Sequence, residues 1–170
     1  MVVGQELITV DLHGLATGGD AVGRQIDGAA AGRVVFVALG APGDRVRARV
    51  LREKKRVAWA EIEDILVAGP TRVVPPCPRF GDCGGCQWQH VAYPVQQAAK
   101  SAIAARALGL PDIQIHSPVA TFGYRERARF VVGAGGAFGF RARRSQRERK
   151  TLTRERCSWF PGRTWSNRLP

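Results

Sequence analysis

Four cysteines constrain this 170-residue chain more than any other feature of its sequence. Cys77, Cys83 and Cys86 follow a C-x5-C-x2-C spacing, and Cys157 is remote from them. The residues between the close pair, Gly84-Gly85, relieve crowding, so two thiolates can reach one metal centre while backbone amides point at the sulfurs. In a reducing cytosol, such clustering favours a metal site over disulfides.

The spacing alone leaves the identity of the metal open. Four thiolates suit either a 4Fe-4S cluster or tetrahedral zinc. Structural zinc sites usually contain two C-x2-4-C pairs, whereas this chain has one, which favours the cluster slightly. For zinc, His90 could be the fourth ligand in place of Cys157.

Positive charge is concentrated in the second part of the chain. The net charge is +12; residues 77–170 carry 16 basic and 5 acidic side chains, whereas residues 1–76 carry 10 and 9. This excess favours a polyanionic partner, either nucleic acid or an anionic membrane face. Met1–Val10 does not have the pattern of a secretory signal, and no run approaches the roughly 18 apolar residues that span a bilayer. We therefore expect a soluble, cytoplasmic protein.

Residues 6–62 consist of short strand-like segments separated by glycine turns, which predicts a small β-barrel. Val34–Leu39 is a continuous apolar run, as expected of a buried strand, and we expect Phe36 to lie in the core. Val57–Ile65 is the predicted closing strand. Pro75-Pro76 excludes both helix and central strand, so it marks a linker.

The second part of the chain predicts one helix and one hairpin. The helix should begin near Pro94, because proline suits a first-turn position, and should end at Gly109. Tyr124–Val132 alternates in the manner of a strand, Gly133–Gly136 turns the chain, and Ala137–Ala142 returns as the second arm.

Basic and aromatic side chains on these strands are the predicted RNA contacts. Arginines that alternate with small apolar residues share one face of a strand, where they can follow a phosphate backbone. Aromatic side chains can stack on unpaired bases. The alternative is that the arginines form a solvated face and the aromatics are core. The predicted contacts are Arg45, Arg47, Arg49, Lys54, Lys55, Tyr124, Arg125, Arg127, Arg129, Phe140, Arg141, Arg143 and Arg144.

Several segments resemble the RNA uracil-C5 methyltransferases, which use S-adenosylmethionine to make 5-methyluridine in ribosomal and transfer RNA. Pro75–His90 closely resembles their cluster loop, and Cys157 falls where their fourth ligand should lie. Other segments look like their TRAM domain, an OB-like barrel, or are similar to signatures of their central domain. These segments are Gly18–Arg24, Val35-Phe36-Val37, Pro42-Gly43-Asp44, Tyr124–Ala128 and Gly139-Phe140-Arg141.

The resemblance implies a mainly β fold with some α. An N-terminal OB-like TRAM β-barrel, residues 1–68, precedes a small α/β iron–sulfur domain, residues 69–157, and an atypical tail, residues 158–170. The resemblance also implies that a 4Fe-4S cluster, rather than zinc, is bound by Cys77, Cys83, Cys86 and Cys157. The implied partner is ribosomal or transfer RNA; we expect no membrane contact and a monomer.

The chain also departs from the family. Its members continue into a Rossmann-like domain with the S-adenosylmethionine site, a cysteine that attacks C6 of uracil, and a general base. No such domain follows here, and all four cysteines are assigned to the cluster. We therefore expect a truncated product or fragment without catalytic residues, with S-adenosylmethionine bound only by the full-length parent. An alternative is a non-catalytic OB-like RNA-binding module with a structural zinc or iron–sulfur site.

Overall fold

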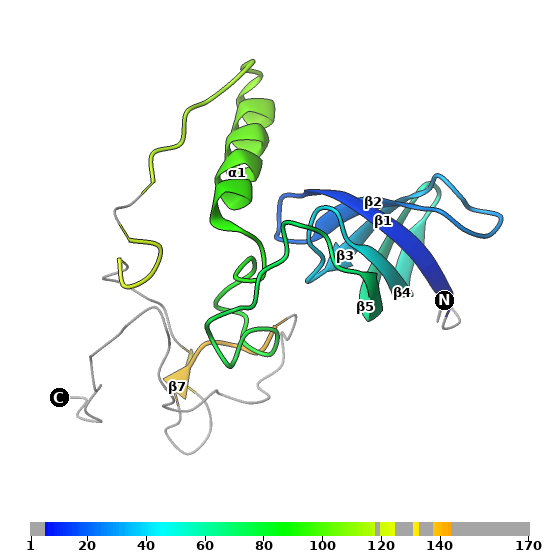
Figure 1. Ribbon diagram of the computed structural model, residues 1–170, viewed down its shortest axis with the longest axis horizontal. Coiled ribbons are helices and arrows are strands. Elements are labelled where there is room, and N and C mark those ends of the chain that lie inside the picture. The colour runs from blue at the N-terminus through cyan, green and yellow to red at the C-terminus, as the bar shows by residue number, and fades with distance from the viewer. Residues whose placement is uncertain (1–5, 118–119, 125–130, 133–137, 144–170) are drawn as a thin grey trace. The chain divides into compact units, whose positions relative to one another are not determined.

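The computed structural model describes residues 6–117, 120–124, 131–132 and 138–143. The chain divides into two compact units. One unit consists of Met1–Pro75 and Gln87–Ile115, and the other of Pro76–Cys86 and His116–Pro170. The first contains the barrel strands and the helix α1, whereas the second contains the cysteine loop and a short hairpin (Figure 1).

Five strands close into a barrel in the first unit. They are β1 (Leu7–Leu15), β2 (Ala21–Gln25), β3 (Val34–Ala38), β4 (Arg45–Lys54) and β5 (Val57–Val67). Their order is β1-β2-β3-β5-β4, with β4 pairing back onto β1. The β3–β5 pair is parallel and the other barrel pairs are antiparallel. This is the arrangement of an OB-type barrel, and the predicted β-barrel is confirmed.

Small and β-branched side chains fill the barrel because a five-stranded barrel has a narrow interior. Strand alternation directs them inward and sends the larger side chains outward. The strands approach closely at Gly23, where an added Cβ would lie 2.2 Å from the carbonyl oxygen of Asp11, so only glycine fits. The buried cluster comprises Ile8, Val10, Leu12, Ala21, Val35, Val37, Val46, Ala48, Val50, Ala58 and Ala60.

Phe36 lies outside this cluster, so the expectation that it belongs to the core is wrong. Val35 and Val37 are fully buried, whereas Phe36 between them is only partly buried. Successive side chains of a strand point to opposite faces, so an apolar run does not require burial on both. On the outer face, the Phe36 ring stacks on Trp59 of β5, with centroids 5.8 Å apart and planes inclined by 21°.

The helix α1 spans Tyr93–Leu108, which confirms the predicted helix. Pro94 lies in its first turn, and Gly109 ends it in the left-handed conformation at φ 67°. Among the residues that the structure describes, no helix is long and apolar enough to cross a membrane.

The predicted hairpin is confirmed where the structure describes it. β6 (Val131–Val132) pairs antiparallel with β7 (Phe138–Gly139), which places Val132 opposite Phe138. The connecting residues 133–137 lie outside the described ranges.

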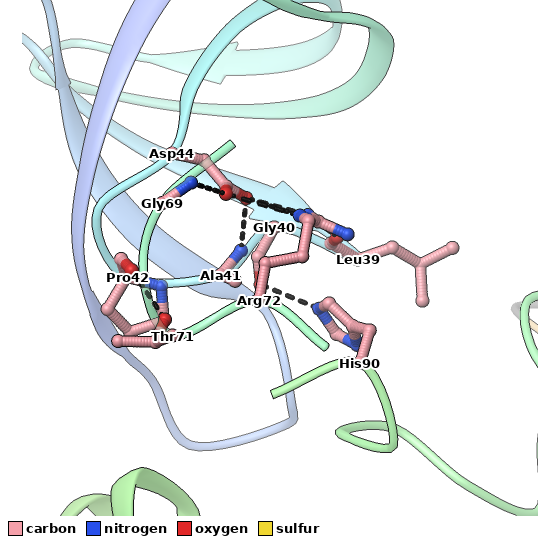
Figure 2. A network of polar contacts seen from close by, with 9 residues as sticks. All are labelled: Leu39, Gly40, Ala41, Pro42, Asp44, Gly69, Thr71, Arg72 and His90. Carbon is pink, nitrogen blue, oxygen red and sulfur yellow. Dashed lines mark hydrogen bonds and ion pairs between the residues drawn. The ribbon is translucent and has the colours of Figure 1, made fainter. Parts of the chain in front are cut away.

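The buried carboxylate of Asp44 joins the barrel to the segment that follows it (Figure 2). Asp44 is 1% exposed and accepts hydrogen bonds from the amides of Ala41 at 2.7 Å and Gly69 at 2.9 Å. The guanidinium of Arg72 donates to both carboxylate oxygens, at 2.6 Å from Nη2, and also to the carbonyl of Leu39 at 2.9 Å. A charged carboxylate is tolerated at this depth because its oxygens are satisfied and its charge is balanced.

Residues 90–92 pair with residues 71–73 beside this network. The Val73 amide donates to the carbonyl of His90 at 2.9 Å, and the Ala92 amide donates to the carbonyl of Thr71 at 2.8 Å. The His90 ring is buried, with Nε2 2.9 Å from the carbonyl oxygen of Gly40 (Figure 2). The two segments that flank the cysteine loop in sequence are therefore held together and fixed to the β3–β4 loop.

Replacing Asp44 with asparagine should destabilise the protein by about 3 to 5 kcal/mol, because the largely buried guanidinium of Arg72 loses its counter-charge. Urea denaturation followed by circular dichroism measures the change. The control Asp11→Asn removes an exposed carboxylate that pairs with Arg45 and should cost less than about 1 kcal/mol. Equal losses of unfolding free energy in the two variants would show that Asp44 contributes no more to stability than an exposed ion pair.

Acidification should weaken the fold in two stages. Burial lowers the pKa of His90 below its usual 6.5, more than the hydrogen bond to Gly40 raises it. The unfolded chain therefore takes up a proton first, and the stability that neutral His90 supplies is complete above pH 6.5 and lost as the pH falls below it. Burial disfavours ionisation of Asp44, but Arg72 and the two amides outweigh it and hold its pKa below 3.8. That second contribution is complete above pH 3.8 and lost as the pH falls through the lowered pKa.

Urea midpoints recorded from about pH 7.5 down to about pH 3 test this prediction. His90→Gln should flatten the change between about pH 7.5 and pH 5. His13→Gln, at an exposed position of β1, should leave that change as in the wild type. A wild-type midpoint that does not fall over this interval would refute the assignment to His90.

Candidate metal centre and nucleic-acid interface

Three cysteines lie in one compact loop of the second unit. Cys77, Cys83 and Cys86 are partly buried thiols. Backbone hydrogen bonds from Phe80 to the Cys77 carbonyl and from Cys83 to the Arg79 carbonyl, each 3.0 Å, fold the loop into consecutive turns. These turns fold the segment that holds the first two cysteines.

The sulfur of Cys83 is a partly buried thiol that one backbone amide approaches. Burial raises the pKa of Cys83, and negative charge on Cys86 and Cys77 raises it further. The Gly85 amide donates to the Cys83 sulfur at 3.4 Å and acts in the opposite direction. Amides directed at sulfur are the usual outer-shell support of iron–sulfur thiolates.

Within the described ranges, no group of three or more His, Cys, Asp or Glu side chains could hold a metal ion. The predicted fourth ligand, Cys157, lies outside those ranges. Cysteine thiols are the ligand type that iron–sulfur clusters and structural zinc use, so the chemistry of the three described cysteines fits a thiolate-bound metal centre.

The return arm of the hairpin pairs with the cysteine loop. The Gly84 amide donates to the carbonyl of Arg141 at 2.9 Å, and the Arg143 amide donates to the carbonyl of Asp82 at 2.8 Å. Cys83 forms a bridge with Ala142. This pairing positions the cysteines against a segment nearly 60 residues further along the chain.

Three predicted RNA contacts belong to this arm, and the structure gives them different surroundings. The ring of Phe140 lies against Gly85, where an added Cβ would be 3.0 Å from it. The Arg143 side chain donates to the carbonyl of Gly81 at 2.9 Å, which supports the loop. Arg141 is exposed.

The zinc alternative assigned a metal-binding role to His90. The structure places His90 in the first unit, where its ring is 2% exposed and Nε2 contacts the Gly40 carbonyl. The three described cysteines belong to the second unit. The suggestion that His90 shares a site with them rested on its closeness to them in the sequence.

The three arginines of β4 share an outer face, as alternation predicts, but each is paired with a carboxylate. Arg45 pairs with Asp11 of β1 at 2.6 Å. On the β5 side, Arg47 pairs with Asp64 and Arg49 pairs with Glu63. These exposed pairs neutralise one another locally, so this part of the barrel is less positive than the sequence of β4 suggests.

The other described candidates from the sequence are exposed. Lys54 ends β4, Lys55 lies in the turn to β5, and Tyr124 is 44% exposed. The predicted contacts outside the described residues are Arg125, Arg127, Arg129 and Arg144.

Arg52 and Trp59 were missed by sequence reasoning. The guanidinium carbon of Arg52 lies 3.9 Å from the Trp59 ring centroid, and Trp59 is the stacking partner of Phe36. A signal was present, because Trp59 stands between Ala58 and Ala60. A narrow barrel takes such small residues inside, so the large ring between them must point outward.

Comparisons with known proteins relate the chain to RNA methyltransferases. No family model matches it. A 23S rRNA (uracil(1939)-C(5))-methyltransferase RlmD from Halomonas elongata is 37% identical over 145 residues, covering 80% of this chain and 29% of that protein. An uncharacterized RNA methyltransferase from Gloeobacter violaceus is 38% identical over 135 residues, with 75% and 29% covered.

A solved structure is similar to this chain as well. The Pyrococcus abyssi tRNA (uracil-54, C5)-methyltransferase, in complex with S-adenosyl-L-homocysteine, aligns with a TM-score of 0.59 and 25% identity. The alignment covers 90% of this chain and 33% of that one.

Barrel, cysteine loop and relatives together define the class of protein that the chain resembles, the RNA methyltransferases. The chain is homologous to the N-terminal region of the RNA uracil-C5 methyltransferases. It spans about 29% of the length of the curated relatives it matches. The resemblance recognised in the sequence is thereby confirmed.

Proposed function

We propose that this chain is the RNA-binding and 4Fe-4S-bearing N-terminal portion of an RNA uracil-C5 methyltransferase that acts on ribosomal or transfer RNA. The observation that carries the proposal is the 37% identity over 145 residues to a 23S rRNA (uracil-C5)-methyltransferase. In this proposal β1–β5 are the TRAM barrel, and the second unit carries the cluster. The S-adenosylmethionine site and the uracil chemistry belong to the remainder of a full-length enzyme.

The proposed cluster ligands are Cys77, Cys83, Cys86 and Cys157. The position of the three described thiols in one loop and the Gly85 amide directed at the Cys83 sulfur support this assignment. When bound, the cluster would cross-link the cysteine loop to the Cys157 segment through iron–thiolate bonds. Its role in this proposal is structural, because it fixes the RNA-facing surface rather than taking part in methyl transfer.

Anaerobic purification should give a brown protein with broad absorbance near about 400 nm and about four iron and four sulfide per chain. Cys83→Ser should lose most of the colour and iron, because a hydroxyl is a poor substitute for a thiolate. His90→Gln is the matched control and should retain the iron, since the His90 ring contacts the Gly40 carbonyl. A colourless wild-type protein with one zinc per chain would exclude the cluster.

RNA binding in this proposal depends on exposed cations that can contact phosphates. Each of the paired arginines, Arg45, Arg47 and Arg49, must give up a carboxylate partner before it can contact a phosphate. Each therefore contributes less binding free energy than Lys54 or Lys55. Within the described residues, neither lysine forms a salt bridge. Tyr124 and Arg141 of the second unit are further proposed contacts, as are Arg125, Arg127, Arg129 and Arg144.

Affinity for a uracil-containing RNA stem–loop should fall steeply with salt, as fluorescence anisotropy across a potassium chloride series would measure. A Lys54→Gln, Lys55→Gln double variant should bind severalfold more weakly and reduce the log–log salt slope by about one to two. The control Arg47→Gln, Asp64→Asn removes an ion pair without changing net charge, so its affinity should stay close to the wild type. A salt-independent affinity would refute phosphate binding by these side chains.

A further inference from the structure

We propose that the outer face of β3 and β5 stacks an unpaired base of single-stranded RNA. Phe36 and Trp59 form the platform, and Arg52 supplies the cation beside it. This inference rests on the RNA-binding function proposed above and deepens it, because it names a surface and the form of RNA that the surface takes.

The strand register aligns these side chains in one row. Phe36 of β3 pairs with Val22 of β2 on one side and with Trp59 of β5 on the other. Trp59 in turn pairs with Arg52 of β4. The four side chains therefore cross four neighbouring strands on the outer face, where the two rings, within 21° of parallel, present a partly exposed aromatic surface.

Positive charge borders this aromatic surface. The adjacent row runs from Arg24 through Val34 and Val57 to Lys54, so cations lie at its two ends and aliphatic side chains lie between them. Neither of these two rows contains an acidic residue, whereas the row on the other side of Trp59 holds Glu61 opposite Arg49. Of the described residues, no carboxylate forms a salt bridge with Arg52, unlike the paired arginines earlier on β4.

This composition selects its ligand. A cross-strand aromatic pair by itself is ordinary sheet packing, but an aromatic surface with Arg52 beside it and a row of cations and aliphatic side chains along one side favours a partner that is both planar and anionic. Unpaired nucleotides fit, because every base offers a π-face and the next phosphate lies within reach of an arginine. Duplex RNA presents phosphates and 2′-hydroxyls but keeps its bases stacked inside, so it does not use the rings.

Trp59→Leu in the full 170-residue chain should weaken binding of a short uridine-rich single-stranded RNA by about 5- to 100-fold and leave the salt slope unchanged. Binding of a blunt RNA duplex of the same length should change less than about twofold. Arg52→Gln should lower the single-strand salt slope by about 0.7. The matched control is His13→Gln, at an exposed position of β1 outside the platform, which should bind as the wild type does.

Photo-crosslinking of the wild-type protein to an RNA that carries 5-iodouridine tests the same surface without a variant. Crosslinks should map by mass spectrometry to peptides containing Phe36 or Trp59. If Trp59→Leu and Phe36→Leu bind RNA with wild-type affinity and the crosslinks map elsewhere, this inference is overturned and the proposed function stands. A wild-type protein that binds neither RNA would overturn both.

Discussion

The buried ion pair between Asp44 and Arg72 is the interaction on which the first unit depends. One carboxylate accepts hydrogen bonds from the β3–β4 loop, from the Gly69 amide beyond β5 and from a guanidinium that also holds the Leu39 carbonyl. Because a charge at 1% exposure is costly unless all its partners are present, these segments have little freedom to move independently. Residues 71–73 then pair with 90–92, so the same network fixes the chain on both sides of the cysteine loop.

Electrostatics on the barrel surface follows from cross-strand placement rather than from the number of arginines. Along β4, the arginines at 45, 47 and 49 face carboxylates of β1 and β5, and their charge is compensated. Beyond a shift in register, Arg52 faces an aromatic ring instead. A single strand with regularly spaced arginines is thus divided into a neutralised portion and a positive portion by what its neighbours contribute.

Much of this architecture could be predicted from local sequence. Glycine turns, strand alternation, Pro94 and Gly109 predicted the barrel and the helix, because turn and capping preferences act over a few residues. The surroundings of the site residues could not be predicted in this way. Ion pairing of the β4 arginines, the outward position of Phe36 and the contact of Gly84 with Arg141 all depend on which strands become neighbours, and no short segment encodes that.

The sequence by itself determined the cysteine spacing, the excess of basic residues and the homology to RNA uracil-C5 methyltransferases, because covalent order and composition are sufficient for each. Tertiary structure decided what those residues face. It turned His90 into a buried partner of Gly40, set the hairpin arm against the cysteine loop and exposed an aromatic pair beside Arg52. The physical reason is that burial and pairing are properties of residues far apart in the chain, fixed only when the barrel closes.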